Sequence, residues 1–272
     1  MKPFSQLCCF LVLALVPSSG FAEGGFKLVS PEQSGLQHVC RIDVDHPLSR
    51  VYYNSSACGG VVAADFTGNG KPELFFINGP GSNKLYLEKS TFSYDDITEQ
   101  SGISDLDRWG NGAAAADIDN DGDLDIYVCN YDAPNELWIN VTKPGSSHPT
   151  FEEKAEKWGL DIVDACVMPA FADYDRDGLL DLYVLNHRLY RAGGRPTEVK
   201  MRVSADFKSG AVLGDEARYY DYDGLENGKP IFREVSRRDI LLRNTGDKFV
   251  DCLLYTSPSP RDGLLSRMPS SA

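Results

Sequence analysis

Short apolar segments alternate with polar turns along most of this chain, and their lengths are those of β-strands. Residues 74–77, 126–128 and 182–185 are the clearest, because they are rich in aromatic and β-branched side chains. Each follows a polar loop that small residues precede. A pair of hairpin-like segments comes next: 83–87 with 94–98, 135–139 with 151–153, and 239–244 with 248–251. The pattern predicts about four short strands per repeat.

The polar loop and its two flanking segments recur in three copies, at residues 59–78, 110–130 and 168–186. Their first loop carboxylates, Asp65, Asp117 and Asp173, recur about every 50 residues. Four short strands at such a period are typical of a propeller blade. We therefore expect an all-β fold, an incomplete β-propeller of about three to four four-stranded blades.

The chain divides by composition into three parts. Residues 1–22 read as a signal peptide, with a basic start, an apolar core of about ten residues that is too short to span a bilayer, and small residues at the cleavage positions. Residues 23–251 are the partial propeller, with repeats near 59–109, 110–167 and 168–251. Residues 252–272 lack the blade pattern and read as a non-native disordered tail, or alternatively as a genuine one.

The polar loops carry the candidate chemistry. Their alternating oxygen donors with a central glycine suit a hard cation with flexible coordination, which indicates Ca²⁺. The second loop offers Asp117, Asp119, Asp121, the Asp123 carbonyl and Asp125; the third offers Asp173, Asp175, Asp177, the Leu179 carbonyl and Asp181. An empty acidic turn is the alternative. An EF-hand is excluded, since its twelfth loop position requires Glu and holds Phe76, Val128 and Val184 here.

The first loop is weaker than the other two. Asp65, Thr67, Asn69, the Lys71 carbonyl and Glu73 keep the spacing but replace two carboxylates by neutral oxygens. Fewer charges lower calcium affinity. A vestigial loop held by its own hydrogen bonds is the alternative.

The loops resemble the FG-GAP or VCBS repeats of integrin-type propellers. The pairing of each loop with a following NELWIN-type segment is similar to the cartilage acidic protein and UnbV group. The resemblance covers roughly residues 26–251 and implies a propeller, but it does not imply one function, because a common fold hosts many activities.

Net charge and cysteines narrow the choice of partners. A formal charge of −13 argues against nucleic acid and anionic membrane surfaces, and a cationic partner would suit it. Cys8 and Cys9 would leave with the signal peptide. Of the others, Cys40 with Cys58 is the favoured disulfide, while Cys129 and Cys166 are either paired or buried free thiols.

The repeat is interrupted at residues 188–238, an insertion that contains 11 basic and 8 acidic residues. This insertion is either a binding loop or a brace between blades. No histidine or serine lies in a catalytic motif, so we expect no catalytic residues. The sequence favours a secreted, calcium-binding adhesion or binding module for an extracellular protein or glycan, or a periplasmic one if the source is bacterial. An enzyme with its site in the propeller channel, or a purely structural surface protein, are the alternatives.

Overall fold

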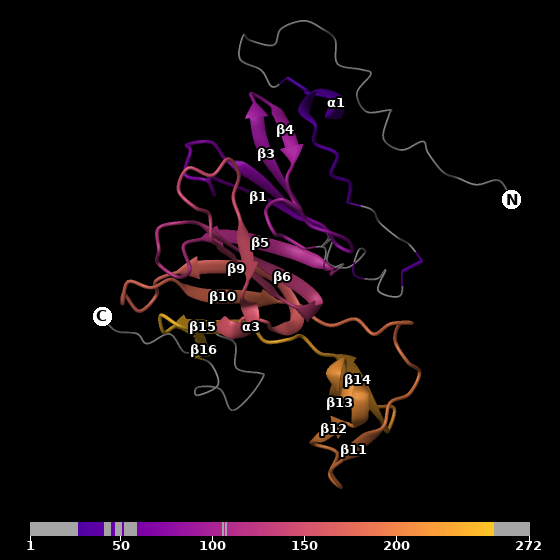
Figure 1. The fold of residues 1–272 in the computed structure, drawn as a ribbon. Helices are drawn as coiled ribbons and strands as arrows, with labels where there is room; N and C mark the ends of the chain where they lie inside the picture. Colours follow the sequence, from indigo (N-terminus) through magenta and orange to yellow (C-terminus); the bar gives the residue numbers. More distant parts are fainter. Residues whose placement is uncertain are drawn as a thin grey trace, which may run out of the picture.

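Three antiparallel four-stranded blades follow one another along the chain (Figure 1). The computed structural model describes residues 27–40, 45, 46, 51, 59–104, 106 and 108–252. The signal peptide, Cys58 and residues 253–272 lie outside that part of the chain, so the predictions about them stay predictions. No helix in the described ranges is long and apolar enough to cross a membrane.

Each blade contains the four strands that the repeat predicted. The first is β1 (Gly60–Ala64), β2 (Glu73–Ile77), β3 (Lys84–Ser90) and β4 (Ser93–Asp96). The second is β5 (Gly110–Ala116), β6 (Asp125–Pro134), β7 (Glu136–Asn140) and β8 (Phe151–Glu153). The third is β9 (Val163–Ala172), β10 (Asp181–Asn186), β15 (Ile240–Asn244) and β16 (Phe249–Asp251). The described residues outside the insertion also include the single-turn helices α1 (Pro31–Ser34) and α3 (Ala155–Trp158). The fold is the expected incomplete β-propeller.

The blades pack face to face, and the strand β6 shows how the sequence encodes this. Ile126 and Val128 belong to the apolar core shared with the first blade, whereas Tyr127 and Cys129 belong to the core shared with the third. Successive side chains of a strand point to opposite faces. A middle blade therefore buries both faces, and its strand reads as an unbroken apolar run.

The third blade has one covered and one open face. Its Tyr183 and Leu185 stand at the positions of Tyr127 and Cys129, but Leu185 is 38% exposed and Met168 beside it is 54% exposed. Among the described residues no further blade covers this face.

Strands β6 and β9 are longer than a blade requires, and their extensions pair with each other. Tyr131 lies opposite Ala165, and Pro134 lies opposite Val163. The pairing joins the second and third blades into one eight-stranded sheet. Sequence reasoning did not predict this ladder, because the repeat pattern stops before the extensions begin.

The insertion forms its own small β-structure rather than an irregular loop. It holds the hairpin β11 (Met201–Val203) and β12 (Gly210–Val212), the 3-10 helix η1 (Gly214–Arg218), and the hairpin β13 (Tyr220–Glu226) and β14 (Lys229–Glu234). These hairpins project away from the blades (Figure 1).

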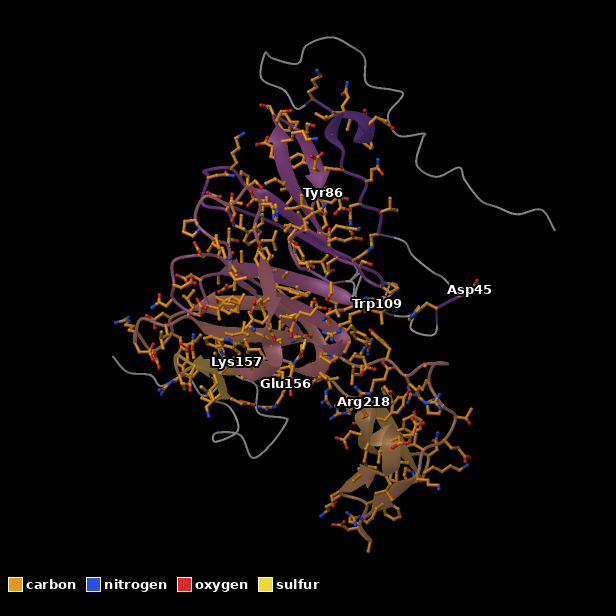
Figure 2. All side chains as sticks on the ribbon, viewed as in Figure 1. Asp45, Tyr86, Trp109, Glu156, Lys157 and Arg218 are labelled. Atoms are coloured by element: carbon orange, nitrogen blue, oxygen red, sulfur yellow. The ribbon has the colours of Figure 1, made fainter. Side chains whose placement is uncertain are left out.

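Ion pairs hold the insertion to the blades at its base. Arg218, which lies where the insertion meets the blades (Figure 2), pairs with Asp132. Arg237 pairs with Asp164 at 2.6 Å. The insertion is thus braced at its base and free at its tip.

The structure distinguishes between the two alternatives for Cys129 and Cys166, a disulfide or buried free thiols. Cys129 and Cys166 are buried free thiols. Burial raises the pKa of Cys166 to about 12, so its thiolate is scarce at neutral pH.

Candidate metal sites

The three polar loops connect the first and second strands of each blade, as the repeat predicted. Loop 1 is residues 65–73, loop 2 is residues 117–125 and loop 3 is residues 173–181. All three share one backbone frame. The chain enters a left-handed conformation at the fourth and sixth loop positions, for example at Asn120 (φ 64°) and Gly122 (φ 99°).

The first carboxylate of each loop is the anchor of this frame. It accepts hydrogen bonds from the backbone N–H groups of the fifth and sixth positions. Asp117 accepts from Asp121 and Gly122 at 3.0 and 3.1 Å, Asp173 from Asp177 and Gly178 at 3.1 and 3.0 Å, and Asp65 from Asn69 and Gly70 at 3.0 and 2.7 Å.

The side chain at the fifth position orients the seventh. Asp121 accepts from the Asp123 N–H at 2.9 Å, Asp177 from the Leu179 N–H at 3.0 Å, and Asn69 from the Lys71 N–H at 2.8 Å. These bonds bring the predicted carbonyl donors into the same turn as the carboxylates. One sequence pattern thus gives one local structure three times.

The ninth position ties the loop to the blade. Asp125 accepts from the Ile118 N–H at 2.8 Å and from the Asn140 N–H at 2.8 Å. Asp181 accepts from Tyr174 at 3.1 Å and from Asn244 at 2.9 Å. Each of these carboxylates thus accepts backbone hydrogen bonds both from its own loop and from the strand that ends at the asparagine.

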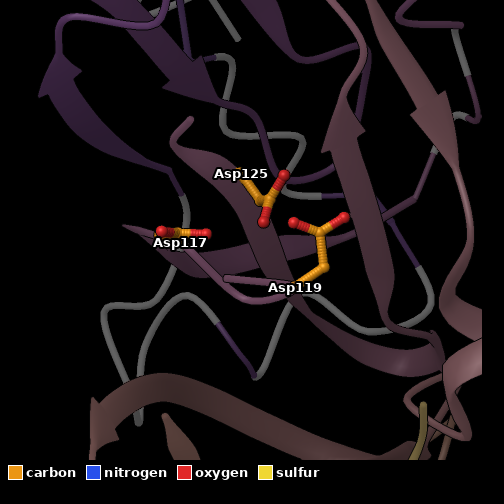
Figure 3. A group of neighbouring side chains, drawn as sticks. All are labelled: Asp117, Asp119 and Asp125. Carbon is orange, nitrogen blue, oxygen red and sulfur yellow. The ribbon is translucent and has the colours of Figure 1, made fainter. Parts of the chain in front are cut away.

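Loops 2 and 3 each bring three carboxylates together. Asp117, Asp119 and Asp125 have ligand oxygens within 4.8 Å of one another, and their carboxylates converge in Figure 3. In loop 3 the group is Asp173, Asp175 and Asp177, so it contains the fifth loop position in place of the ninth. Asp121 and Asp181 lie in the same turns but outside these two trios.

One carboxylate oxygen of loop 2 bears on whether this loop binds a cation. Asp119 Oδ1 is buried and accepts no hydrogen bond in the described structure. A buried polar oxygen without a partner is costly, so such an atom calls for a water or an ion. Oxygen donors from several carboxylates fit Ca²⁺ in both number and hardness. The oxygen donors of loop 2 therefore suit calcium.

The electrostatics of loop 2 point the same way. Burial raises the pKa of Asp125 to about 7, and the neighbouring charges of Asp119 and Asp121 act in the same direction. The pKa of Asp119 is raised too, by burial and then by the charge of Asp121. A divalent cation would offset both causes.

Loop 1 satisfies its carboxylates internally. The Thr67 hydroxyl lies 3.2 Å from Glu73 Oε1 and 3.4 Å from Asp65 Oδ1. Glu73 also accepts from the backbone N–H groups of Phe66 and Thr67, at 2.8 and 3.2 Å. With two carboxylates and a bridging hydroxyl, loop 1 needs no cation to be satisfied.

Two residues that contact the loops were missed by sequence reasoning. Asn140 and Asn244 end β7 and β15, and both are buried. A signal for them was present, because NELWIN and DILLRN each place an asparagine six residues into the segment that follows a loop. The sequence alone gave no reason to connect them with the loops.

Comparison with known proteins agrees with the repeat and the blades. The FG-GAP-like repeat family matches residues 65–128, which include loop 2 and most of loop 1's blade. Cartilage acidic protein 1 of Xenopus tropicalis is 26% identical over 145 residues, which is 50% of this chain and 22% of that protein. The human protein of that name is 26% identical over 134 residues, 49% of this chain and 20% of its own length. The match thus spans about a fifth of these relatives. Residues 65–128 thus match the FG-GAP-like repeat family, and about half of the chain is similar to cartilage acidic protein 1.

Proposed function

We propose that this chain is part of an extracellular, calcium-stabilised β-propeller that serves as a binding module. The observation that carries the calcium part is the buried Asp119 Oδ1, which accepts no hydrogen bond within the described residues and belongs to a side chain of the Asp117, Asp119 and Asp125 group. Calcium, when bound, supplies positive charge and flexible coordination there. The chain's own residues do the positioning, since the backbone bonds to Asp117 and Asp125 hold the ligands in place.

A structural role follows from where the loops lie. Each loop joins the first two strands of a blade, so a bound cation fixes the end of that hairpin. A ligand that binds only the folded state stabilises it by about 2.7 kcal/mol at a hundredfold excess over its dissociation constant.

The insertion is the surface that we propose for binding. Lys200, Arg202 and Lys208 are exposed on and beside the β11–β12 hairpin. Among the described residues their side chains form no ion pair, although the Lys208 backbone N–H donates to Asp206 at 3.2 Å. Phe207, next to Lys208, is 46% exposed. Free cations around an exposed aromatic ring favour an anionic partner, and a sulfated glycan fits that chemistry. Secretion is supported by the leader-like residues 1–22.

A thermal melt followed by circular dichroism tests the calcium part. We expect the β-sheet transition to rise in 2 mM calcium relative to excess chelator, on the order of several °C. Identical melts in the two conditions would refute calcium stabilisation.

Heparin-affinity chromatography tests the binding surface. Changing Lys200, Arg202 and Lys208 to glutamate should abolish salt-sensitive retention of the full chain on the sulfated glycan.

Three lysines on the blades provide the matched control. Lys89, Lys157 and Lys248 are exposed, and their reversal to glutamate changes the net charge equally. Equal loss of retention in both triple variants would show that only net charge matters, and it would exclude the hairpin as the binding surface.

A further inference from the structure

Asn140 connects the loops of two neighbouring blades. It is the last residue of β7 and is 2% exposed. Its side-chain Nδ2 donates to the Phe66 carbonyl at 2.9 Å and to the Leu124 carbonyl at 3.1 Å. Phe66 is the second residue of loop 1, and Leu124 is the eighth residue of loop 2. One amide thus bridges two loops that lie far apart in the sequence.

Asn244 repeats this connection one blade later. It ends β15, is 1% exposed, and donates to the Ile118 carbonyl at 3.1 Å and to the Leu180 carbonyl at 3.2 Å. Ile118 and Leu180 are the second residue of loop 2 and the eighth of loop 3. The same two loop positions, the second of one loop and the eighth of the next, are therefore joined at both blade interfaces.

The backbones of these asparagines extend the connection to the candidate ligands. The N–H of Asn140 donates to Asp125, whose other oxygen accepts from the N–H of Ile118. The carbonyl of Ile118 in turn accepts from Asn244, whose own N–H donates to Asp181. A continuous path of hydrogen bonds therefore runs from loop 1 through loop 2 to loop 3.

The first blade carries no asparagine at this position, and no blade precedes it among the described residues. The position that corresponds to Asn140 is Glu88. Glu88 pairs with Lys71 at 3.9 Å and accepts from the Phe92 N–H at 3.3 Å. Its side chain has no amide donor and makes no such bridge.

We propose that Asn140 and Asn244 couple the loops, so that calcium bound at one loop raises the calcium affinity of its neighbour. The inference rests on the proposed calcium function. A cation that orders one loop also fixes the carbonyl of that loop's second residue. The asparagine that donates to this carbonyl then restrains the ninth-position aspartate of the next loop, which accepts from the asparagine's own N–H. Binding at the second loop then costs less ordering. Coupling of this kind changes affinity by about fivefold or more.

Asn140 also lies in the glycosylation sequon Asn140-Val141-Thr142. Its Nδ2 is the atom that would carry a glycan, and both of its donors are used inside the protein. Attachment of a glycan there would remove at least one of the two bonds. The structure thus assigns Asn140 to the loop connection instead.

Calorimetric titration of the full chain with calcium tests the coupling between loops 2 and 3. Asp119→Ala leaves loop 3 as the stronger site, and Asp175→Ala leaves loop 2. These two variants give the affinity of each loop without help from the other. If the loops were independent, the wild-type titration would equal the sum of the isotherms of the two variants. We expect instead that the wild-type chain binds its second calcium ion about fivefold or more tightly than independent loops would. The same three titrations in an Asn244→Ala background should show no such excess.

Asn186→Ala is the matched control. Asn186 is also a buried asparagine whose Nδ2 donates to a backbone carbonyl, that of Arg238 at 2.7 Å, but it lies at the end of β10 away from loop 3. It should lower stability and leave the excess affinity intact. Circular dichroism verifies that each variant folds. If Asn244→Ala does not fold, Asn244→Ser replaces it, since its shorter side chain cannot span both carbonyls.

The outcomes separate this inference from the calcium proposal. Calcium binding without excess affinity in the wild-type chain overturns the coupling alone. An excess that persists in the Asn244 variant, or that disappears in Asn186→Ala, overturns the role of Asn244. Absence of any calcium binding overturns both proposals.

Discussion

Asp119→Ala should change stability in opposite directions with and without calcium. Asp119 suits this test, because its buried Oδ1 accepts no hydrogen bond within the described residues. Asp117, in contrast, holds two backbone N–H groups, and its removal would damage the loop under all conditions. Asp119→Ala therefore separates calcium binding from loop geometry.

The magnitude follows from the loop's charges. Asp117, Asp119 and Asp125 have oxygens within 4.8 Å. At that distance a pair of like charges repels by roughly 3 kcal/mol at an effective dielectric constant of 20, and solvent at this partly exposed loop reduces the value to about 1 kcal/mol. In chelator the variant should thus be as stable as the wild-type chain or up to about 1 kcal/mol more stable.

In calcium the sign reverses. The variant forfeits the stabilisation from the cation, about 2.7 kcal/mol at a hundredfold excess over the dissociation constant. For a chain of this size, each kcal/mol shifts the melting temperature by about 2–4 °C, so the expected loss is roughly 5–10 °C. Differential scanning calorimetry in 2 mM calcium and in chelator measures both values. Asp161→Ala, an exposed aspartate outside the loops, is the control and should change neither. Equal destabilisation by Asp119→Ala in both conditions would refute the reasoning, because it would assign the carboxylate to a calcium-independent contact.

Three further predictions concern the first loop, the blade interface and the buried thiols. Thr67→Asp places a third carboxylate in loop 1 and should lower the melting temperature in chelator but raise it in calcium; a drop in both conditions would exclude a cation there. Gly112→Ala should destabilise the chain by about 1–3 kcal/mol in urea unfolding, because its Cβ would lie 2.4 Å from the Val167 carbonyl; an unchanged midpoint would contradict the close packing of β5 on β9. Cys129 and Cys166 should react with a maleimide only after denaturation, since both are buried and the pKa of each thiol is raised by burial; rapid labelling of the native chain at pH 7 would refute this.

The sequence by itself determined the blades and the loops. The order of small, polar and apolar residues acts over short distances along the chain. The backbone conformation of each loop, for example, depends on bonds such as that from the Asp121 N–H to Asp117, only four residues away. The strands that flank the loops follow from their β-branched and aromatic residues. These features recur three times, so three short segments sufficed to predict the blades and the three loops, whereas the structure groups only three of the predicted carboxylates in each of loops 2 and 3.

The tertiary structure alone decided how the loops relate to one another. The bond from Asn140 to Phe66 joins residues 74 positions apart, and that from Asn244 to Ile118 joins residues 126 positions apart. Contacts of this kind join residues of different blades, and the pattern of residues within one blade does not specify which groups of the neighbouring loop they meet. The repeat therefore specified three similar loops, and blade packing made them a connected set.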